Sequence, residues 1–277
     1  MASELDYDGL ALGKPTTYTG TYTPSLLQSI ARAPLREPLA IENGRLPFQG
    51  LDWWTAYELS WLNRRGRPEI AVMHLQVPAS SPCIIESKSL KLYLGSFSQT
   101  EFGSRAEVVR TLESDLRLAV RAPVMVQLES LDALASEGIG HLAGVCLDSL
   151  DVDIEHYQVR PELLHVTGDV NVRQALHSNL LRSCCPVTGQ PDWGSLYIEY
   201  VGLEIQHEDL LRYIVSYRHH SGFHEETVER IFMDLLRQCA PTALTVYARY
   251  LRRGGLEINP FRSTRDEAPP RVRLARQ

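Results

Sequence analysis

A short loop in the second half of the sequence combines thiols with a carboxyl group. Residues 183–194 read SCCPVTGQPDWG, and Asp192 follows Cys185 by seven positions. A cysteine is nucleophilic as its thiolate, and a nearby carboxyl group can donate or accept a proton. The pairing of thiol and acid predicts covalent catalysis. The alternative from the spacing alone is a buried structural cysteine followed by an aspartate that caps a turn.

A second polar segment stands before an amphipathic stretch. Residues 216–226 read SYRHHSGFHEE. A carboxylate in this segment could accept two N–H donors from the edge of a guanine-like ring, and a histidine could polarise a substrate. The alternative is a helix N-terminus that carries favourable acidic residues.

Two further segments are basic. Residues 86–93 read ESKSLKLY and residues 252–255 read RRGG. Lysine, arginine and open backbone N–H groups suit phosphates, and paired arginines could recognise the 2′-phosphate of NADPH. The alternative is a set of solvated basic residues at strand ends. No GxGxxG motif follows a strand, so a dinucleotide is not expected to bind in the Rossmann manner.

The elements that would position these segments occur twice along the chain. Each copy is expected to open with a strand at an Asp-Trp pair, at Asp52 in the first copy and Asp192 in the second. The alternation predicts one face made of Tyr57, Leu59 and Trp61 in the first strand and of Leu196, Ile198 and Tyr200 in the second. Each copy then reaches a Ser-aromatic pair, at 96–97 and at 216–217.

An amphipathic helix is expected next in each copy. Its apolar positions are Val108, Val109, Leu112, Leu116 and Val120 in the first copy and Val228, Ile231, Phe232, Leu235 and Cys239 in the second. Each helix should stop at an Ala-Pro pair, at 122–123 and 240–241, and a strand should follow at 124–128 and 243–251. This order predicts an α+β fold of antiparallel strands with helices on one face.

The remaining segments are expected to be less regular. Residues 1–50 are rich in Pro, Thr and Gly and indicate an extended arm with one short helix at 25–33. Residues 131–151 and 169–180 are expected to be connections with helical and strand-like pieces. Residues 263–277 are expected to be an exposed arm.

Composition excludes several classes of protein. The 277 residues are 44% hydrophobic, which is ample for a buried core, and the formal net charge of -6 argues against a protein that mainly holds nucleic-acid phosphates. Neither a membrane span nor a signal peptide is recognisable. Five cysteines without disulfide-like spacing fit a reducing compartment, so a cytoplasmic location is expected.

The four segments together resemble the NADPH-dependent 7-cyano-7-deazaguanine reductases, nitrile reductases of queuosine biosynthesis, in their long two-module form. The similarity spans most of the chain and includes ESKSLKLY at 86–93, the loop from Cys185 to Asp192, FHE at 223–225 and RRGGL at 252–256. It implies the tunnelling fold (T-fold), with tandem pseudo-repeats of antiparallel strands, helices packed on one face and sites at module or subunit interfaces. It divides the chain into an arm at 1–50, a first module at 51–150 and a second module at 151–277.

The resemblance also implies partners and site residues. The chain should form a homodimer and act on a small-molecule substrate, without direct contact with nucleic acid or membrane. The implied residues are Cys185, Asp192 and His224 for catalysis; Ile85, Glu86, Ser87, His224 and Glu225 for the deazaguanine; and Ser87, Lys88, Arg253 and Gly254 for the co-substrate NADPH. No metal is expected. Cys184 stands where the family would be expected to have a small polar residue.

The implied reaction is a four-electron reduction of the nitrile to 7-aminomethyl-7-deazaguanine with two NADPH. The thiolate of Cys185 adds to the nitrile carbon and Asp192 protonates the nitrogen, which gives a covalent thioimide. After a hydride is added the adduct expels the thiolate and leaves an imine. The imine must stay enclosed, because water would hydrolyse it.

Two other readings stay open. A zinc-dependent pterin or purine cyclohydrolase on the same fold would use the metal to activate water. His219, His220 and His224 lie near the two cysteines in sequence, but without the spacing of a ligand pair. A non-catalytic purine-binding T-fold protein should have lost the thiol, the acid or the basic residues, and all of them are present.

Overall fold

The structure, a computed structural model, describes residues 18–42 and 44–277, and the chain divides into two units. Unit 1 is Met1–Arg45, Leu51–Gly138 and Arg252–Ile258; unit 2 is Leu46–Gly50, Ile139–Leu251 and Asn259–Gln277. Both units combine antiparallel strands with helices, so the expected α+β class is confirmed. The division at 1–50, 51–150 and 151–277 stays a prediction. None of the helices within the described ranges is long and apolar enough to cross a membrane.

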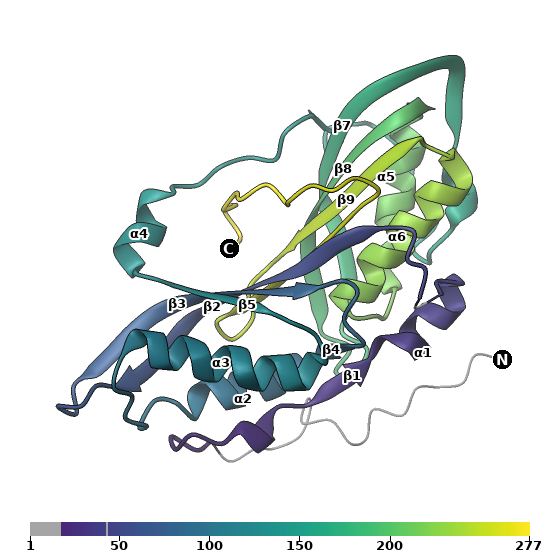
Figure 1. Ribbon diagram of the computed structural model, residues 1–277. Coiled ribbons are helices and arrows are strands. Elements are labelled where there is room, and N and C mark those ends of the chain that lie inside the picture. The colour runs from purple at the N-terminus through teal and green to yellow at the C-terminus, as the bar shows by residue number, and fades with distance from the viewer. Residues whose placement is uncertain (1–17, 43) are drawn as a thin grey trace. The chain divides into compact units, whose positions relative to one another are not determined.

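Unit 1 is built on an antiparallel hairpin, β2 (Gln49–Leu62) and β3 (Pro68–Pro78), with β5 (Met125–Glu129) beside β3. Two helices follow the hairpin, α2 (Ser87–Gly95) and α3 (Arg105–Val120), and both lie on one face of these strands (Figure 1). The smaller elements are η1 (Pro24–Leu26), β1 (Ser29–Ala31), α1 (Arg32–Arg36), η2 (Glu37–Leu39), β4 (Cys83–Ile85) and α4 (Leu131–Ser136).

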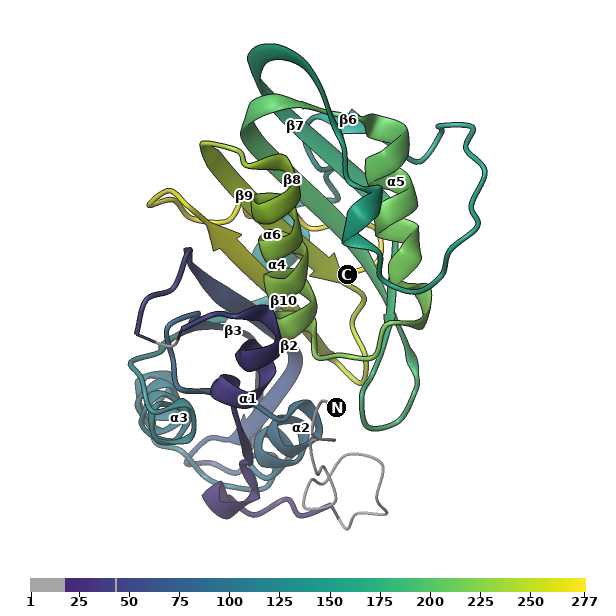
Figure 2. The same cartoon turned by 90° about the vertical axis from the view of Figure 1, so that its right-hand side faces the viewer.

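Unit 2 is built on a longer antiparallel hairpin, β7 (Val166–Cys184) and β8 (Pro191–Ile205). Strand β9 (Ala243–Tyr250) lies beside β8 and pairs in turn with β10 (Leu256–Ser263), of which residues 259–263 belong to this unit. The helices α5 (His207–Ser216) and α6 (His224–Cys239) cover one face of β7, β8 and β9 (Figure 2). The remaining elements are β6 (Val145–Cys146), which is parallel to β7, η3 (Pro161–Leu163) and η4 (Tyr217–His219).

Each unit therefore repeats one order of elements, a hairpin followed by two helices and a strand. The repeat expected from the sequence is present, but the prediction that the strands at Asp52 and Asp192 correspond to each other is wrong. Asp52 lies on the first strand of its hairpin, β2, whereas Asp192 opens the second strand of its hairpin, β8. The error arose because both strands of a hairpin alternate with the same period of two. The sequence also predicted one helix in each copy where the structure has two.

A β-bulge changes the expected faces of β2. The register of β2 and β3 shifts between Ala56 and Leu59, so that Tyr57 and Glu58 together oppose one residue of β3. The bulge puts Ala56 in the same core cluster as Leu59 and Trp61, while Tyr57 packs in a separate cluster with Leu134. The prediction that Tyr57 shares a face with Leu59 is wrong, since one extra residue reverses the alternation.

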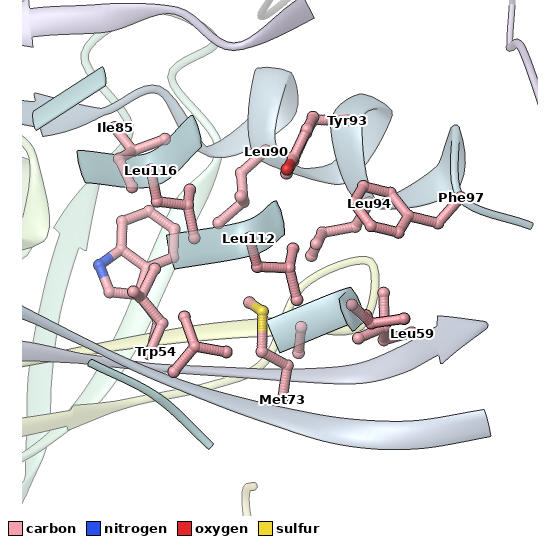
Figure 3. Packing of buried hydrophobic residues seen from close by; sticks show 14 of the residues in the cluster. Trp54, Leu59, Met73, Ile85, Leu90, Tyr93, Leu94, Phe97, Leu112 and Leu116 are labelled. Atoms are coloured by element: carbon pink, nitrogen blue, oxygen red, sulfur yellow. The ribbon is translucent and has the colours of Figure 1, made fainter. Parts of the chain in front are cut away.

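The two predicted amphipathic helices are confirmed as α3 and α6. In unit 1 the stripe of α3 packs with the strands and α2 in one core, where Leu112 and Leu116 approach Trp54 and Met73 (Figure 3). Every predicted apolar position of the two stripes except Val109 is buried, and Val109 packs against the core from its edge. The helices end at Val120 and Cys239, and the next residue in each case has a left-handed backbone.

Three segments differ from the expectation. Residues 25–33 do not form one helix, because Ser29–Ala31 pair with β4 and this tertiary pairing overrides local preference. Residues 169–180 are part of the continuous strand β7, paired with β8. The tail is not simply exposed, since Leu274 and Gln277 are buried and the side-chain amide of Gln277 donates to the carbonyl of Tyr250 at 2.8 Å.

Candidate active site

Cys185 begins the turn that joins β7 to β8. Its N–H donates to the carbonyl of Gln190 and its carbonyl accepts from the N–H of Gly189, both at 2.9 Å. Gly189 has a φ of 66°, a left-handed backbone that favours glycine. The turn is therefore closed by its own backbone, and it holds Cys185 at a fixed point with a side chain that is 5% exposed.

The corresponding turn of unit 1 shows what stands in place of the thiol. It joins β2 to β3, and Asn63 makes the same two kinds of bond, donating to Arg67 and accepting from Gly66. Gly66 has a φ of 71°, as Gly189 has 66° in unit 2. Asn63 is thus the counterpart of Cys185, so this turn carries a thiol in unit 2 and an amide in unit 1.

Cys184 has different surroundings from Cys185. Its N–H donates to the carbonyl of His220 at 2.7 Å, and its carbonyl accepts from Gly222 at 3.1 Å. Its sulfur lies 3.8 Å from the carbonyl oxygen of Arg218. Side chains that are adjacent in an extended segment point to opposite sides. The structure therefore separates the two thiols, and it places Cys184 against the segment before α6.

Asp192 and His224 come together in unit 2. Asp192 is the second residue of β8 and pairs with Ser183, and its side chain is almost fully buried. His224 is the first residue of α6, and its Nε2 lies 3.4 Å from Oδ2 of Asp192. Glu225 follows it in the first turn of the helix and is also buried. The structure thus gathers a carboxyl group, an imidazole and a second carboxyl group near the turn that bears Cys185.

Tyr250, which sequence reasoning did not select, lies against this pair. Its ring stacks on the imidazole of His224, with centroids 3.7 Å apart and planes 8° from parallel. Burial raises the pKa of Tyr250 well above its ordinary value, while the hydroxyls of Ser183 and Thr227 lower it less. The phenol therefore stays neutral. The sequence feature that could have indicated Tyr250 is its place as the last residue of a buried strand, two positions before the segment RRGG.

Glu86 has a structural role in unit 1. It is the N-cap of α2, and its carboxylate accepts from the N–H groups of Lys88 and Ser89, both at 2.7 Å. The side chain is fully buried, with Ile85 before it on β4 and Ser87 after it as the first helical residue. Each carboxylate oxygen has a further lone pair, so the cap does not prevent Glu86 from accepting another N–H.

The turn from β9 to β10 gathers basic groups in unit 1. Arg253 and Leu256 bond to each other across it, which requires the left-handed backbone of Gly254 at a φ of 56°. A Cβ on Gly254 would stand 3.1 Å from Nζ of Lys91, so that lysine lies against the turn. Sequence reasoning did not assign Lys91 to the site, although its place one helical turn after Lys88 was a signal. Arg252 instead lies over the ring of Tyr57, at 4.9 Å.

The expected site residues thus form two groups. Ile85, Glu86, Ser87, Lys88, Arg253 and Gly254 belong to unit 1, and Cys185, Asp192, His224 and Glu225 belong to unit 2. In residues 18–42 and 44–277 no three His, Cys, Asp or Glu side chains are grouped as metal ligands. The chemistry that these residues themselves offer is addition of a thiol coupled to proton transfer.

Comparison with known proteins defines the class. Residues 18–128 match the family model described as "Nitrile reductase, 7-cyano-7-deazaguanine-reductase N-term", and residues 191–269 match the model described as "QueF-like protein". Among solved structures, the chain is similar to one described as "archaeosine synthase QueF-Like in the apo form", with 19% identity and a TM-score of 0.30 over 35% of this chain and 95% of that chain. The two family models define a nitrile-reducing oxidoreductase. The chain belongs to the QueF family of 7-cyano-7-deazaguanine reductases, which serve queuosine biosynthesis.

Proposed function

We propose that this chain reduces the nitrile of 7-cyano-7-deazaguanine to the aminomethyl group through a covalent thioimide on Cys185, with Asp192 as the proton donor. The observation that carries the proposal is the pairing of Asp192 with His224, 3.4 Å apart and both largely buried, beside the turn that bears Cys185. A thiol, a carboxyl group and an imidazole are the groups that this addition requires.

The first step is addition to the nitrile. The thiol of Cys185 loses its proton, its sulfur bonds to the nitrile carbon as one π bond of the nitrile opens, and the nitrogen takes a proton from Asp192, so the thioimide contains every atom of the substrate. His224, in contact with the carboxyl group, holds that group in place and can pass the proton lost by the thiol back to Asp192. The carbon of a thioimide accepts a hydride more readily than the carbon of a nitrile does.

NADPH, when bound, supplies the hydrides, one for each of the two reductions. After the first reduction the carbon–sulfur bond breaks, Cys185 leaves as the thiolate and an imine remains. The second reduction and a further proton give the primary amine. The burial of Cys185 and Asp192 supports the exclusion of water that the imine needs.

The basic turn of unit 1 fits a phosphorylated co-substrate. We propose that Ser87, Lys88, Arg253 and Gly254 bind NADPH, with the guanidinium of Arg253 directed to the 2′-phosphate. The turn of two left-handed glycines leaves the backbone open to a phosphate, and Lys91 adds charge beside it.

The purine would be held by buried carboxylates. We propose that Glu86 and Glu225 accept N–H groups of the deazaguanine edge, with Ile85 and Ser87 beside it and His224 near the reacting nitrile. Both glutamates are almost fully buried, where a hydrogen bond to a charged group contributes more than it does at the surface. We also propose a tunnelling fold and a cytoplasmic homodimer, of which the dimer is testable by light scattering on the purified protein.

The test is to trap the adduct. Mixing the enzyme with the cyano substrate in the absence of NADPH should increase the protein mass by that of the whole substrate, because addition to a nitrile loses no atoms. Cys184→Ala is the matched control and should still form the adduct, whereas Cys185→Ala should not. An adduct on Cys185→Ala and none on Cys184→Ala would move the nucleophile by one residue and contradict the proposal.

A further inference from the structure

We propose that Tyr250 is a positioning residue for the acid pair, whose ring fixes the plane of the His224 imidazole and so directs its Nε2 to Asp192. This inference rests on the roles proposed above for His224 and Asp192. Its basis is a close parallel contact, with ring centroids 3.7 Å apart and planes 8° from parallel, between two residues of the same unit.

The imidazole needs such a support. His224 is the first residue of α6, before the helix has formed a complete turn around it, and its ring is 12% exposed. Rotation of the ring about its own bond would move Nε2 away from Oδ2 of Asp192. A flat surface against one face of the ring opposes that rotation, because a tilted ring would collide with it.

Tyr250 is itself held on several sides. Its N–H donates to Oδ1 of Asn259 at 3.0 Å, and its carbonyl accepts from the side chain of Gln277 at 2.8 Å. Both partners are buried. Tyr250 pairs with Gly194 on β8, where a Cβ would come within 3.3 Å of the ring carbons, so glycine leaves room for the ring. The surface under His224 is therefore fixed by the sheet and by the side chain of Gln277.

The phenol oxygen is not required for this role. The Tyr250 side chain is fully buried, and burial and the nearby charges of Asp192 and Glu225 raise its pKa well above the ordinary value. The group thus remains protonated at the pH of any assay. The flat ring is the feature that acts on His224. Phenylalanine at position 250 should therefore hold the imidazole as well as tyrosine does.

Two variants separate the ring from the hydroxyl. Tyr250→Phe keeps a flat ring, and Tyr250→Met fills a similar volume with a flexible chain. We expect the rate of adduct formation without NADPH to stay within about threefold for Tyr250→Phe and to fall roughly tenfold or more for Tyr250→Met. The Kd of the cyano substrate on a Cys185→Ala background should change by less than about threefold in both, because Glu86 and Glu225, which are proposed to hold the purine edge, are untouched.

Tyr247→Met is the matched control. Tyr247 is equally buried on the same strand, but it lies three positions before Tyr250, so its ring points to the other face of the sheet, where it contacts Phe261. Tyr247→Met should leave the rate of adduct formation within about threefold of the wild type, even if it lowers the free energy of unfolding. Equal rates for Tyr250→Met and Tyr250→Phe, or an equal loss in Tyr247→Met, would overturn the inference.

NMR on the unmodified enzyme provides a test that needs no Tyr250 variant to fold. The carbon-bound protons of the His224 ring should resonate upfield of an ordinary histidine, because they lie over an aromatic face, and they are assigned by their loss in His224→Gln. Ordinary positions would overturn the inference. If Asp192→Asn and His224→Gln form the adduct at the normal rate, the proposed function fails; if they are slow and Tyr250→Met is not, only the role of Tyr250 fails.

Discussion

Nε2 of His224 lies 3.4 Å from Oδ2 of Asp192, although the two residues stand 32 positions apart on different elements, as 224 − 192 shows. His224 is the first residue of α6, and Asp192 is the second residue of β8. In a largely buried site such a contact gives the carboxyl group a neighbour with which to exchange protons. Replacing the Asp192 carboxyl group by a group of the same shape that cannot donate a proton should therefore lower the reaction rate without weakening substrate binding.

Asp192→Asn should keep the fold and the affinity for the cyano substrate while kcat falls roughly 10²- to 10⁴-fold. The amide is nearly the same size as the carboxylic acid but cannot deliver a proton. Steady-state oxidation of NADPH measures kcat, and titration with the cyano substrate measures its Kd. A variant with ordinary turnover would remove Asp192 from the mechanism.

Arg253→Ala should lower kcat/KM for NADPH about 10- to 100-fold and leave the value for NADH nearly unchanged. A charge-assisted hydrogen bond to the 2′-phosphate contributes about 1.5–3 kcal/mol, and NADH has no such group. Arg252→Ala is the matched control, since that guanidinium lies over Tyr57 instead. If Arg253→Ala weakened both cofactors equally, the residue would not select between them.

The parts of the fold that were predicted correctly depend on local patterns. The stripe Val108, Leu112, Leu116 and Val120 predicts α3 because each residue meets the next on one helix face, whatever lies opposite. The face of Tyr57 could not be predicted in this way. It depends on a bulge, and a bulge is a property of two paired strands rather than of one sequence segment.

The candidate site also has parts that the sequence predicts and parts that it does not. Cys185 and Asp192 could be selected from one loop, because residue types seven positions apart are visible in the sequence. Their placement at opposite ends of a hairpin turn arises from the pairing of β7 with β8. The stack of Tyr250 on His224 arises from the packing of β9 against α6. No spacing within either segment encodes that contact, and a buried tyrosine is an ordinary core residue by sequence.

Leu112→Ala should destabilise the protein by about 2–5 kcal/mol, because it leaves a cavity at the centre of the unit 1 core. Leu118→Ala on the same helix is the matched control, since Leu118 is 75% exposed and its loss should change the free energy of unfolding by less than about 0.5 kcal/mol. Urea denaturation followed by circular dichroism measures both. Similar values for the two variants would contradict the assigned core.

His220 should make the stability depend on pH. Burial, aided by the charge of Arg230, lowers its pKa in the folded protein to about 4 from an ordinary 6.5. The ring lies by Tyr217, at 5.2 Å between centroids, and a Cβ on Gly222 would stand 2.8 Å from its Nε2. Its backbone carbonyl accepts from the N–H of Cys184, so the residue also helps to hold the segment beside the turn that bears Cys185.

The depressed pKa fixes the sign of the effect. Between about pH 6.5 and pH 4 the unfolded chain binds a proton at His220 that the folded protein does not, so stability is full above this window and is lost as pH falls through it. From pH 7 to pH 5 the loss should be about 2 kcal/mol. His220→Gln removes the titration, so its free energy of unfolding in urea should fall by about 2 kcal/mol less than that of the wild type over the same interval. Parallel pH profiles for the two proteins would mean that His220 is protonated in the folded state as readily as in water.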